Sequence, residues 1–342
     1  MSKKEKNEIL KESSIETSPA EVMIEKLLAE LEKQKEENKR LKEANKKLKE
    51  EILEYQKNGV SGLRRREIFY KTLESDIEEN AQEFVKDIEL INDETLKEKV
   101  ASWDLNEIKD CKLSILMSDL AYLSFVNREG HNAGDSLLKH IGEIAENDLG
   151  SPKIGESEKE SPFIAYRHGG DEFTAIIYKP IEDAEKMAKE FNLKVEQSKI
   201  DILEKYGLKP HIDIGVAHLS EGLEAFKELI MAGVTIPAGD RLRKIENLLV
   251  GIADHRAILN KTKTRITYLM ELRSKKPDVY KEVIDDLRKG ALGTKDEEID
   301  FLLKHNEVEK FIDKKIEETI KKDKENIGLE KDIIKKIARR KQ

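Results

Sequence analysis

Hydrophobic residues recur along this chain of 342 residues with two different periods. Near the N-terminus they follow a heptad, and charged residues fill most of the remaining positions. This pattern predicts one long helix over 19–57 that pairs with a second copy as a coiled coil. The a positions are Ile24, Leu31, Asn38, Asn45 and Ile52, and the d positions are Leu27, Gln34, Leu41, Leu48 and Tyr55.

The start of this helix is marked by Ser18-Pro19-Ala20-Glu21, which is a capping box with proline in the first helical position. The polar residues 1–18 before it are expected to be disordered. Asn38 and Asn45 at a positions favour a parallel, in-register pair, because two buried amides satisfy each other only in that arrangement. The alternative is a single, highly charged helix, since Gln34 and the two asparagines leave a thin apolar seam.

Shorter apolar runs, rich in β-branched and aromatic residues, predict strands further along the chain. Two of them flank Gly169-Gly170, and a glycine pair between such runs indicates a hairpin. Glycine there tolerates a positive φ and lets a ligand approach the backbone. The predicted strands are 113–117, which reads as a buried strand, 163–166, 173–177 and 212–217.

Helical spacing of apolar residues fills the segments between the strands. It predicts helices within 70–108, after Tyr122, over 137–145, over 181–205 and around Ala253 to Arg265. Residues 266–268 then close the domain, and 130–135 is a turn. Alternating strands and helices with an inserted hairpin describe an α+β domain, in which a mixed, mainly antiparallel sheet is covered by helices. A charged helical extension is expected over 271–342.

Composition changes this picture in one respect. Charged residues make up 39% of the chain, well above the roughly 25% that is usual for globular domains. The excess suits long solvated helices better than a second compact core. The chain holds 63 Lys and Arg against 71 Asp and Glu, a net charge of -8 with both signs interspersed. That balance argues against a nucleic-acid surface and against docking on an anionic membrane.

The cysteine count and the hydropathy pattern indicate a cytoplasmic location. Cys111 is the single cysteine, which excludes an internal disulfide and a cysteine-cluster metal site. No apolar run reaches the length of a transmembrane helix, and no signal core follows Met1. A protein of this kind that senses anything outside the cell does so through an unidentified sensor or effector protein.

The most specific stretch is Gly169-Gly170-Asp171-Glu172-Phe173. A glycine pair followed by acids is, on its own, more often an ordinary turn. The full string, however, resembles the signature of the GGDEF family, the diguanylate cyclases. Val60-Ser61-Gly62-Leu63, the strand around Gly215 and the Ala253-Asp254 helix resemble other segments of that family, in the same order. The resemblance places a nucleotidyl cyclase-like domain over 58–270, with enlarged segments near 74–108 and 218–250.

Asp119 and Asp171 are candidate metal ligands. Asp119 ends a buried strand and Asp171 lies on the predicted hairpin, and magnesium binds hard oxygen ligands such as carboxylates together with phosphate oxygens. Asp119 alone would instead read as the N-cap of the following helix. The resemblance implies that Asp119, Asp171 and the backbone carbonyl of Leu120 bind Mg²⁺ or Mn²⁺. It also implies that Glu172 activates the attacking hydroxyl or binds a second metal.

The resemblance further implies two sets of GTP contacts. Asn127 and Asp135 match the residues that read guanine, although the turn between Asn127 and Gly130 is one residue shorter than in the family. Lys261 and Arg265, four apart on one helical face, match the cations that bind the β- and γ-phosphates. In so charged a chain such a pair is usually solvated surface. Backbone N–H groups of Gly169 and Gly170 would also face the phosphates.

Two departures from the family pattern bear on activity. Ser124 stands where the family has a phosphate-binding lysine, and Glu160-Ser161-Pro162-Phe163 replaces its product-inhibition motif. The sequence therefore predicts a diguanylate cyclase that joins two GTP molecules as a homodimer paired through 19–57. One rival is a degenerate domain that binds GTP or cyclic di-GMP without turnover, and another is a purely structural coiled-coil adaptor.

Overall fold

The computed structural model divides the chain into two compact units, 1–55 and 56–342. The residues that it describes are 19–57, 59–127, 130–153, 161–205, 209–275, 278 and 325–339. The segment 1–18, predicted to be disordered, lies outside the described residues, as does most of 271–342.

Where the structure describes it, the first unit consists of the helix α2 (Pro19–Gln56), which confirms the helix predicted from the heptad pattern. Three leucines of the predicted seam are exposed: Leu31 by 47%, Leu41 by 56% and Leu48 by 54%. The side chains of Ile24, Leu27, Ile52 and Tyr55 lie outside the described residues. Pairing of α2 with a second copy stays a prediction.

Within the described residues, the second unit is built on a five-stranded sheet in the order β1-β3-β4-β2-β5. β1 pairs with β3 in parallel, and the remaining neighbours are antiparallel. This confirms the mixed sheet and the hairpin predicted from the sequence. The strands are β1 (Arg64–Arg65), β2 (Ser114–Leu120), β3 (Phe163–Arg167), β4 (Glu172–Ile177) and β5 (Ile212–His218).

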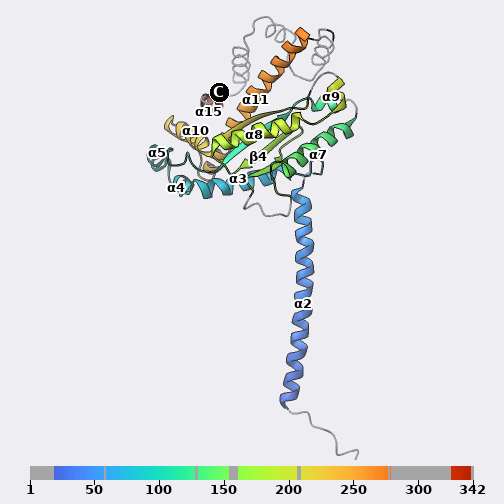
Figure 1. Cartoon of the computed structure of the whole chain (residues 1–342). Helices are drawn as coiled ribbons and strands as arrows, with labels where there is room; N and C mark the ends of the chain where they lie inside the picture. The colour runs from blue at the N-terminus through green and yellow to red at the C-terminus, as the bar shows by residue number, and fades with distance from the viewer. Residues whose placement is uncertain are drawn as a thin grey trace, which may run out of the picture. The chain divides into compact units, whose positions relative to one another are not determined.

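Helices cover both faces of this sheet (Figure 1). They are α3 (Arg66–Asn80), α4 (Gln82–Val85), α5 (Asp93–Ala101), α6 (Leu123–Val126), α7 (His131–Asn147), α8 (Ile181–Glu196), α9 (Asp201–Lys205), α10 (Leu219–Met231), α11 (Arg241–Lys275) and α15 (Glu325–Arg339). Two helical predictions were too continuous, since 70–108 holds parts of three helices and 181–205 is interrupted between α8 and α9.

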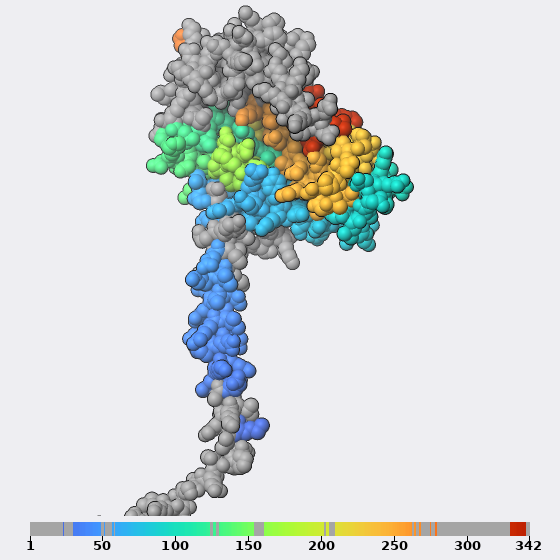
Figure 2. Space-filling model, turned by 180° about the vertical axis from the view of Figure 1, so that it is seen from behind, coloured from blue at the N-terminus to red at the C-terminus, as the bar shows by residue number. Residues whose placement is uncertain are grey.

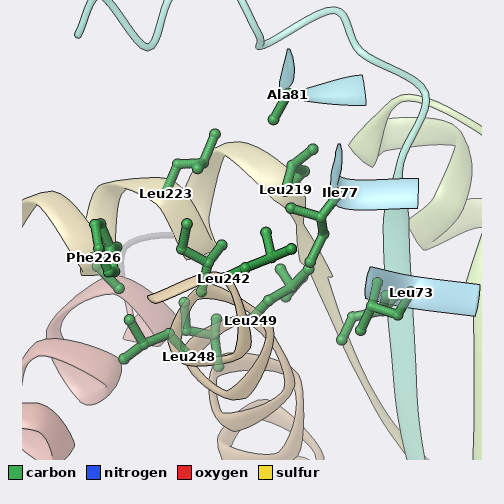
Figure 3. Close-up of a cluster of buried hydrophobic side chains, with 14 of the residues drawn as sticks. Leu73, Ile77, Ala81, Leu219, Leu223, Phe226, Leu242, Leu248 and Leu249 are labelled. Atoms are coloured by element: carbon green, nitrogen blue, oxygen red, sulfur yellow. The ribbon is translucent and has the colours of Figure 1, made fainter. Parts of the chain in front are cut away.

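The alternation of side chains along β2 separates two hydrophobic cores. Ile115 and Met117 enter the core beneath α3, α5, α10, α11 and α15. Leu116 and Leu120 enter the second core, beneath α7 and α8, which lie over the same face in Figure 1. Figure 3 shows the first core, where leucines of α10 and α11 meet Leu73 and Ile77 of α3. Trp103 is buried there as well.

Two further segments differ from the prediction. α11 begins at Arg241, well before Ala253, and it continues through 266–268, so no strand or loop closes the domain there. Helix α7 begins at His131, so Asp135 lies inside a helix and not in a turn. The first turn of α7 is largely polar, so its apolar period begins later than the helix. Helix α11 instead buries Leu242, Ile245 and Leu249 at helical spacing, within a stretch that the family resemblance treats as an enlarged segment.

The C-terminal helix α15 packs against α10 and α11, as Figure 2 shows from behind. Ile333, Ile337 and Ala338 are buried in the same core as the sheet residues. The extension predicted over 271–342 is therefore helical where it is described, and this part of it belongs to the domain core. No helix among the described residues is long and apolar enough to span a membrane.

Arg256 of α11 joins these layers from a buried position. Its guanidinium donates to both carboxylate oxygens of Glu221 at 2.8 and 2.9 Å. It also donates to the Val216 carbonyl of β5 at 2.6 Å. On the opposite side it reaches the α15 carbonyls of Ala338 at 3.0 Å and Ile337 at 3.3 Å. One side chain thus ties the sheet, α10, α11 and α15 together.

Replacing Arg256 should therefore destabilise the whole domain. Arg256→Ala leaves the Glu221 carboxylate buried without its cation, and breaking one side of a buried pair lowers the free energy of unfolding by about 3–5 kcal/mol. Urea unfolding followed by circular dichroism measures this loss. Lys263→Ala, at an exposed position of the same helix, is the matched control and should change little. A loss below roughly 0.5 kcal/mol in Arg256→Ala, the range of ordinary surface changes, would contradict the assignment.

Candidate functional site

The candidate site lies where β2 ends between its two neighbours. Asp119 is directly opposite Glu172 of β4 and directly opposite Asp213 of β5. Residues directly opposite each other in antiparallel strands share one face of the sheet, with their Cβ atoms about 5 Å apart. Three carboxylates from three adjacent strands therefore lie in a row on one face. The chain order of these residues gives no hint of that arrangement.

The hairpin turn is joined to the end of β2 by backbone bonds. The Leu120 N–H donates to the Asp171 carbonyl at 2.8 Å, which brings Asp171 beside Asp119 and Leu120. Within the turn, the N–H groups of His168 and Gly169 both donate to the Glu172 carbonyl. The structure thus places Asp119, Leu120, Asp171 and Glu172 together, as the sequence predicted, although it does not test their roles.

The two glycines of the hairpin turn do not adopt the positive φ that the sequence analysis considered for them. Neither Gly169 nor Gly170 has a positive φ. A Cβ on Gly169 would lie 2.8 Å from the Glu172 carboxylate, whereas one on Gly170 would meet nothing within 4 Å. Close approach, and not a left-handed conformation, is therefore the reason for glycine at 169. Because the Gly169 N–H is bonded inside the turn, it is not directed at a ligand in this structure.

Helix α11 brings a cation and a further carboxylate to the row. The Lys261 ammonium lies 2.6 Å from the Asp119 carboxylate. Asp254 is partly exposed, but neighbouring protein atoms displace water from its carboxyl group, and this desolvation raises its pKa. The charges of Glu172 and Asp119 raise that pKa further, and Lys261 opposes them. The side chain of Arg265, the second predicted phosphate contact, lies outside the described residues.

The donor set fits a magnesium or manganese ion that is shared with phosphate oxygens. Among the described residues, no group of three or more His, Cys, Asp or Glu side chains is arranged to hold a metal ion by itself. Magnesium, however, is usually bound through one or two carboxylates together with substrate phosphates. Asp119 and Asp171 supply two such carboxylates, and Lys261 already supplies Asp119 with positive charge.

Asn127 lies against the start of α7, the helix that carries Asp135. A Cβ on Gly134 would lie 1.8 Å from the Asn127 Oδ1 atom, so glycine at 134 is what lets this amide rest on the first turns of α7. Asp135 follows directly and is exposed. A carboxylate and an amide are groups that suit the hydrogen-bonding edge of a purine. Residues 128–129 and the Ser124 side chain lie outside the described residues.

Arg167 is a neighbour of the site that the sequence patterns did not reveal. Its Nε donates to the Gly169 carbonyl at 2.5 Å and its Nη2 to the Gly170 carbonyl, so it fixes the turn. Its guanidinium also stacks on the Phe173 ring. Burial lowers its pKa, while the charges of Asp171 and Asp135 counteract that shift. The signal in the sequence was an arginine at the end of an apolar strand.

His211 and Asp213 were missed as well. His211 lies between two carboxylates, with Nδ1 2.7 Å from Glu196 and Nε2 3.1 Å from Asp213. Burial by itself would lower the pKa of His211, but the bonds and charges of Asp213 and Glu196 outweigh it, so the pKa is raised. An aspartate inside the apolar run 212–217 was the signal in the sequence.

A second group of titratable side chains includes His168, which follows β3 and packs against α3, and Glu246 of α11. The His168 ring packs against Phe69 and Tyr70, and burial together with the nearby Arg66 charge lowers its pKa to about 4. Glu246 is buried, and burial plus the charge of Glu74 raise its pKa to about 7, against the effect of Arg243. His168 is thus neutral at pH 7, and Glu246 is near its midpoint.

Comparison with known families identifies the middle of the chain. Residues 89–233 match the family described as "Diguanylate cyclase, GGDEF domain". Among curated proteins, an uncharacterized membrane protein of Staphylococcus haemolyticus is 29% identical over 117 residues, which are 34% of this chain and 30% of that protein. A similarly described protein of Staphylococcus aureus is 25% identical over 111 residues, 32% of this chain and 28% of its own. The matched part is therefore under a third of either relative.

Two solved structures resemble part of this chain at low sequence identity. One is the coiled coil and GGDEF domain of DgcB from Caulobacter crescentus in complex with c-di-GMP, with 16% identity, a TM-score of 0.37, and coverage of 60% of this chain and 95% of that one. Another is the diguanylate cyclase SiaD with its activator SiaC from Pseudomonas aeruginosa, with 18% identity, a TM-score of 0.33, and coverage of 62% and 65%.

The raised pKa of Glu246 predicts a pH-dependent stability. A carboxyl with pKa about 7 when folded and 4.5 when unfolded stabilises the fold below pH 4.5, and this stability is lost as the pH rises toward 7. Glu246→Gln removes that loss. It should leave stability unchanged near pH 4.5 and raise it at pH 8 by about 1–3 kcal/mol, since one pKa unit corresponds to about 1.4 kcal/mol.

Urea unfolding at both pH values measures the difference. Glu74→Gln is the matched control, because it removes only the neighbouring charge and should give a smaller gain at pH 8. A Glu246→Gln protein that is destabilised equally at pH 4.5 and pH 8 would show that the carboxyl is held as a charged partner, contrary to this prediction.

Proposed function

Because the chain carries a GGDEF domain, matched over residues 89–233, we propose that it is a diguanylate cyclase that condenses two GTP molecules into cyclic di-GMP. The observation that carries this proposal is the junction of β2 with the hairpin, where Asp119, Asp171 and Glu172 meet beneath Lys261. Carboxylates and a cation at one point are what nucleotidyl transfer requires.

The proposed reaction consists of two equivalent transfers. In each, the 3′ hydroxyl of one GTP attacks the α-phosphorus of the other and forms a new P–O bond. The bond between the α- and β-phosphates breaks, and pyrophosphate leaves with the electron pair. Glu172 is exposed at the start of β4, and it would accept the proton of the hydroxyl. Two transfers close the ring and release two pyrophosphates.

The remaining residues bind and orient the nucleotide. Asp119, Asp171 and the Leu120 carbonyl would hold Mg²⁺ or Mn²⁺, which neutralises phosphate charge when bound. Lys261 pairs with Asp119, and it would exchange that partner for a phosphate oxygen. Arg265 lies one helical turn further along α11 and would assist it. Asn127 and Asp135 would read the guanine edge. With GTP as its substrate, the domain would work in the cytoplasm.

The reaction needs two domains, because each would hold one GTP. The exposed leucines of α2 give the chain an apolar seam that a second copy would cover. Pairing through 19–57 would raise the effective concentration of one half-site for the other. Sensor or effector proteins would then act by changing how two such domains meet.

A second candidate function rests on one feature of the sequence. Ser124 replaces the lysine that the family uses on the phosphates, so the triphosphate has one cation fewer. A domain weakened in this way can still bind GTP or cyclic di-GMP and signal without turnover. The retained Asp119, Asp171, Glu172 and Lys261 favour the enzyme.

The purified protein, incubated with GTP and Mg²⁺, should produce cyclic di-GMP and pyrophosphate, resolved by chromatography. Asp171→Asn should reduce the product by at least about a hundred-fold, the usual effect of removing a charge-stabilising group from an active site, without loss of fold. Asp183→Asn, an exposed change on α8, should leave turnover intact.

Replacing GTP with ATP tests the guanine pocket and should give almost no product. Binding of GTP by calorimetry without any product would establish the second candidate function. Unchanged turnover in Asp171→Asn would refute the site as proposed.

The role of α2 is tested by moving charge into its seam. Leu41→Glu with Leu48→Glu should dissociate the pair, because buried like charges oppose association. Turnover should then fall and depend steeply on protein concentration, while GTP binding stays unchanged. Sedimentation velocity and activity at several concentrations measure both effects.

Lys39→Glu with Lys46→Glu places the same two acidic residues outside the predicted a and d positions and serves as the control. If the seam variant stays a dimer with full activity, α2 is not the dimerising element.

A further inference from the structure

Asp213 is the second residue of the otherwise largely apolar strand β5, and it is only 1% exposed. Its Oδ1 atom contacts His211 at 3.1 Å. Its Oδ2 atom is buried and has no hydrogen-bond partner among the described residues. A buried carboxylate oxygen without a partner destabilises a fold. Such a residue therefore calls for an explanation other than stability.

Asp213 shares its face of the sheet with the proposed site. The same face of β5 carries Gly215, where a Cβ would lie 2.0 Å from the Ala253 carbonyl, so this face lies against α11. Directly across the pairing is Asp119, and beyond Asp119 lies Glu172. Like charges directly opposite each other weaken a sheet. This row therefore favours any cation that binds beside it.

His211 holds Asp213 in place and compensates part of its charge. Both ring nitrogens face carboxylate oxygens, and an imidazole that donates on both sides is positively charged. Glu196 on the far side also accepts from the Asn192 amide at 2.9 Å, which anchors the network in α8. Glu196, His211 and Asp213 thus form one chain of contacts from α8 to the side of Asp119.

We propose that Asp213 is a positioning residue for the divalent cation of this site: its carboxylate, oriented by His211, acts through Asp119 to strengthen cation binding. The inference rests on the proposed function for the identity of the site. Asp213 needs no direct contact with the ion, because a full charge one strand away acts over the distance between paired strands.

The test titrates the full-length protein with Mn²⁺ alone, and electron paramagnetic resonance measures free Mn²⁺. Without nucleotide, no phosphate oxygens contribute to binding. Asp119→Asn defines the component that belongs to this site. Asp213→Asn and Asp213→Ser should both raise the Mn²⁺ concentration for half-saturation of that component on the order of ten-fold, from the loss of one nearby charge.

A second variant should change Mn²⁺ affinity in the opposite direction, which a purely structural role of these residues would not produce. His211→Gln removes the compensating positive charge but keeps an uncharged N–H donor for Asp213, so it should bind Mn²⁺ more tightly than the wild type. Asp201→Asn, an exposed aspartate outside the row, should change nothing. Thermal unfolding of each variant shows that the protein measured is folded.

The outcomes separate this inference from the proposed function. Weaker binding in both Asp213 variants with tighter binding in His211→Gln supports the positioning role. Unchanged binding in the Asp213 variants, weaker binding in His211→Gln, or no Asp119-dependent Mn²⁺ component in the wild type overturns it. If the Mn²⁺ results are as expected but GTP gives no cyclic di-GMP, the enzymatic proposal fails and the role of Asp213 stands.

Discussion

The register of β2 between β4 and β5 is the constraint on which the rest of the site depends. Side chains alternate along a strand, so a slip by one residue would move Asp119 to the opposite face. That face is filled by the core in which Leu116 and Leu120 pack. Ile115 and Met117 are fixed in the other core in the same way. Core packing therefore decides that Asp119 lies beside Glu172 and Asp213.

Helix α11 supplies what this row of acids lacks. It crosses β5 so closely at Gly215 that a side chain there would collide with its backbone. Arg256 fixes the same helix through buried contacts with β5, α10 and α15. Because a helix is rigid over a few turns, these anchors also determine where Lys261 meets Asp119. The docking of α15 thereby bears on a site that it does not contact.

Local patterns in the sequence predicted the elements whose signals are local. The hairpin at Gly169, the strand that ends near Asp119 and the helix α2 followed from apolar periodicity and turn residues. Helix α11 starts at Arg241, inside a stretch that the family resemblance treats as an enlarged segment. The packing of α15 depends on tertiary contacts, which no local period encodes. The row of acids was missed for the same reason. Asp213 is near Asp119 only through strand pairing, and its partner His211 is held by Glu196 of α8.

The candidate residues lie on both sides of the sheet, near the hairpin turn. Asn127 and Asp135 belong to the side covered by α7, whereas Asp119, Glu172 and Lys261 belong to the side covered by α11. A nucleotide with its base on the first side and its phosphates on the second must cross the edge of the sheet at the turn. Arg167 holds that turn through the carbonyls of Gly169 and Gly170. A side chain at 169 would displace Glu172, so the turn and the acid beside it are constrained together.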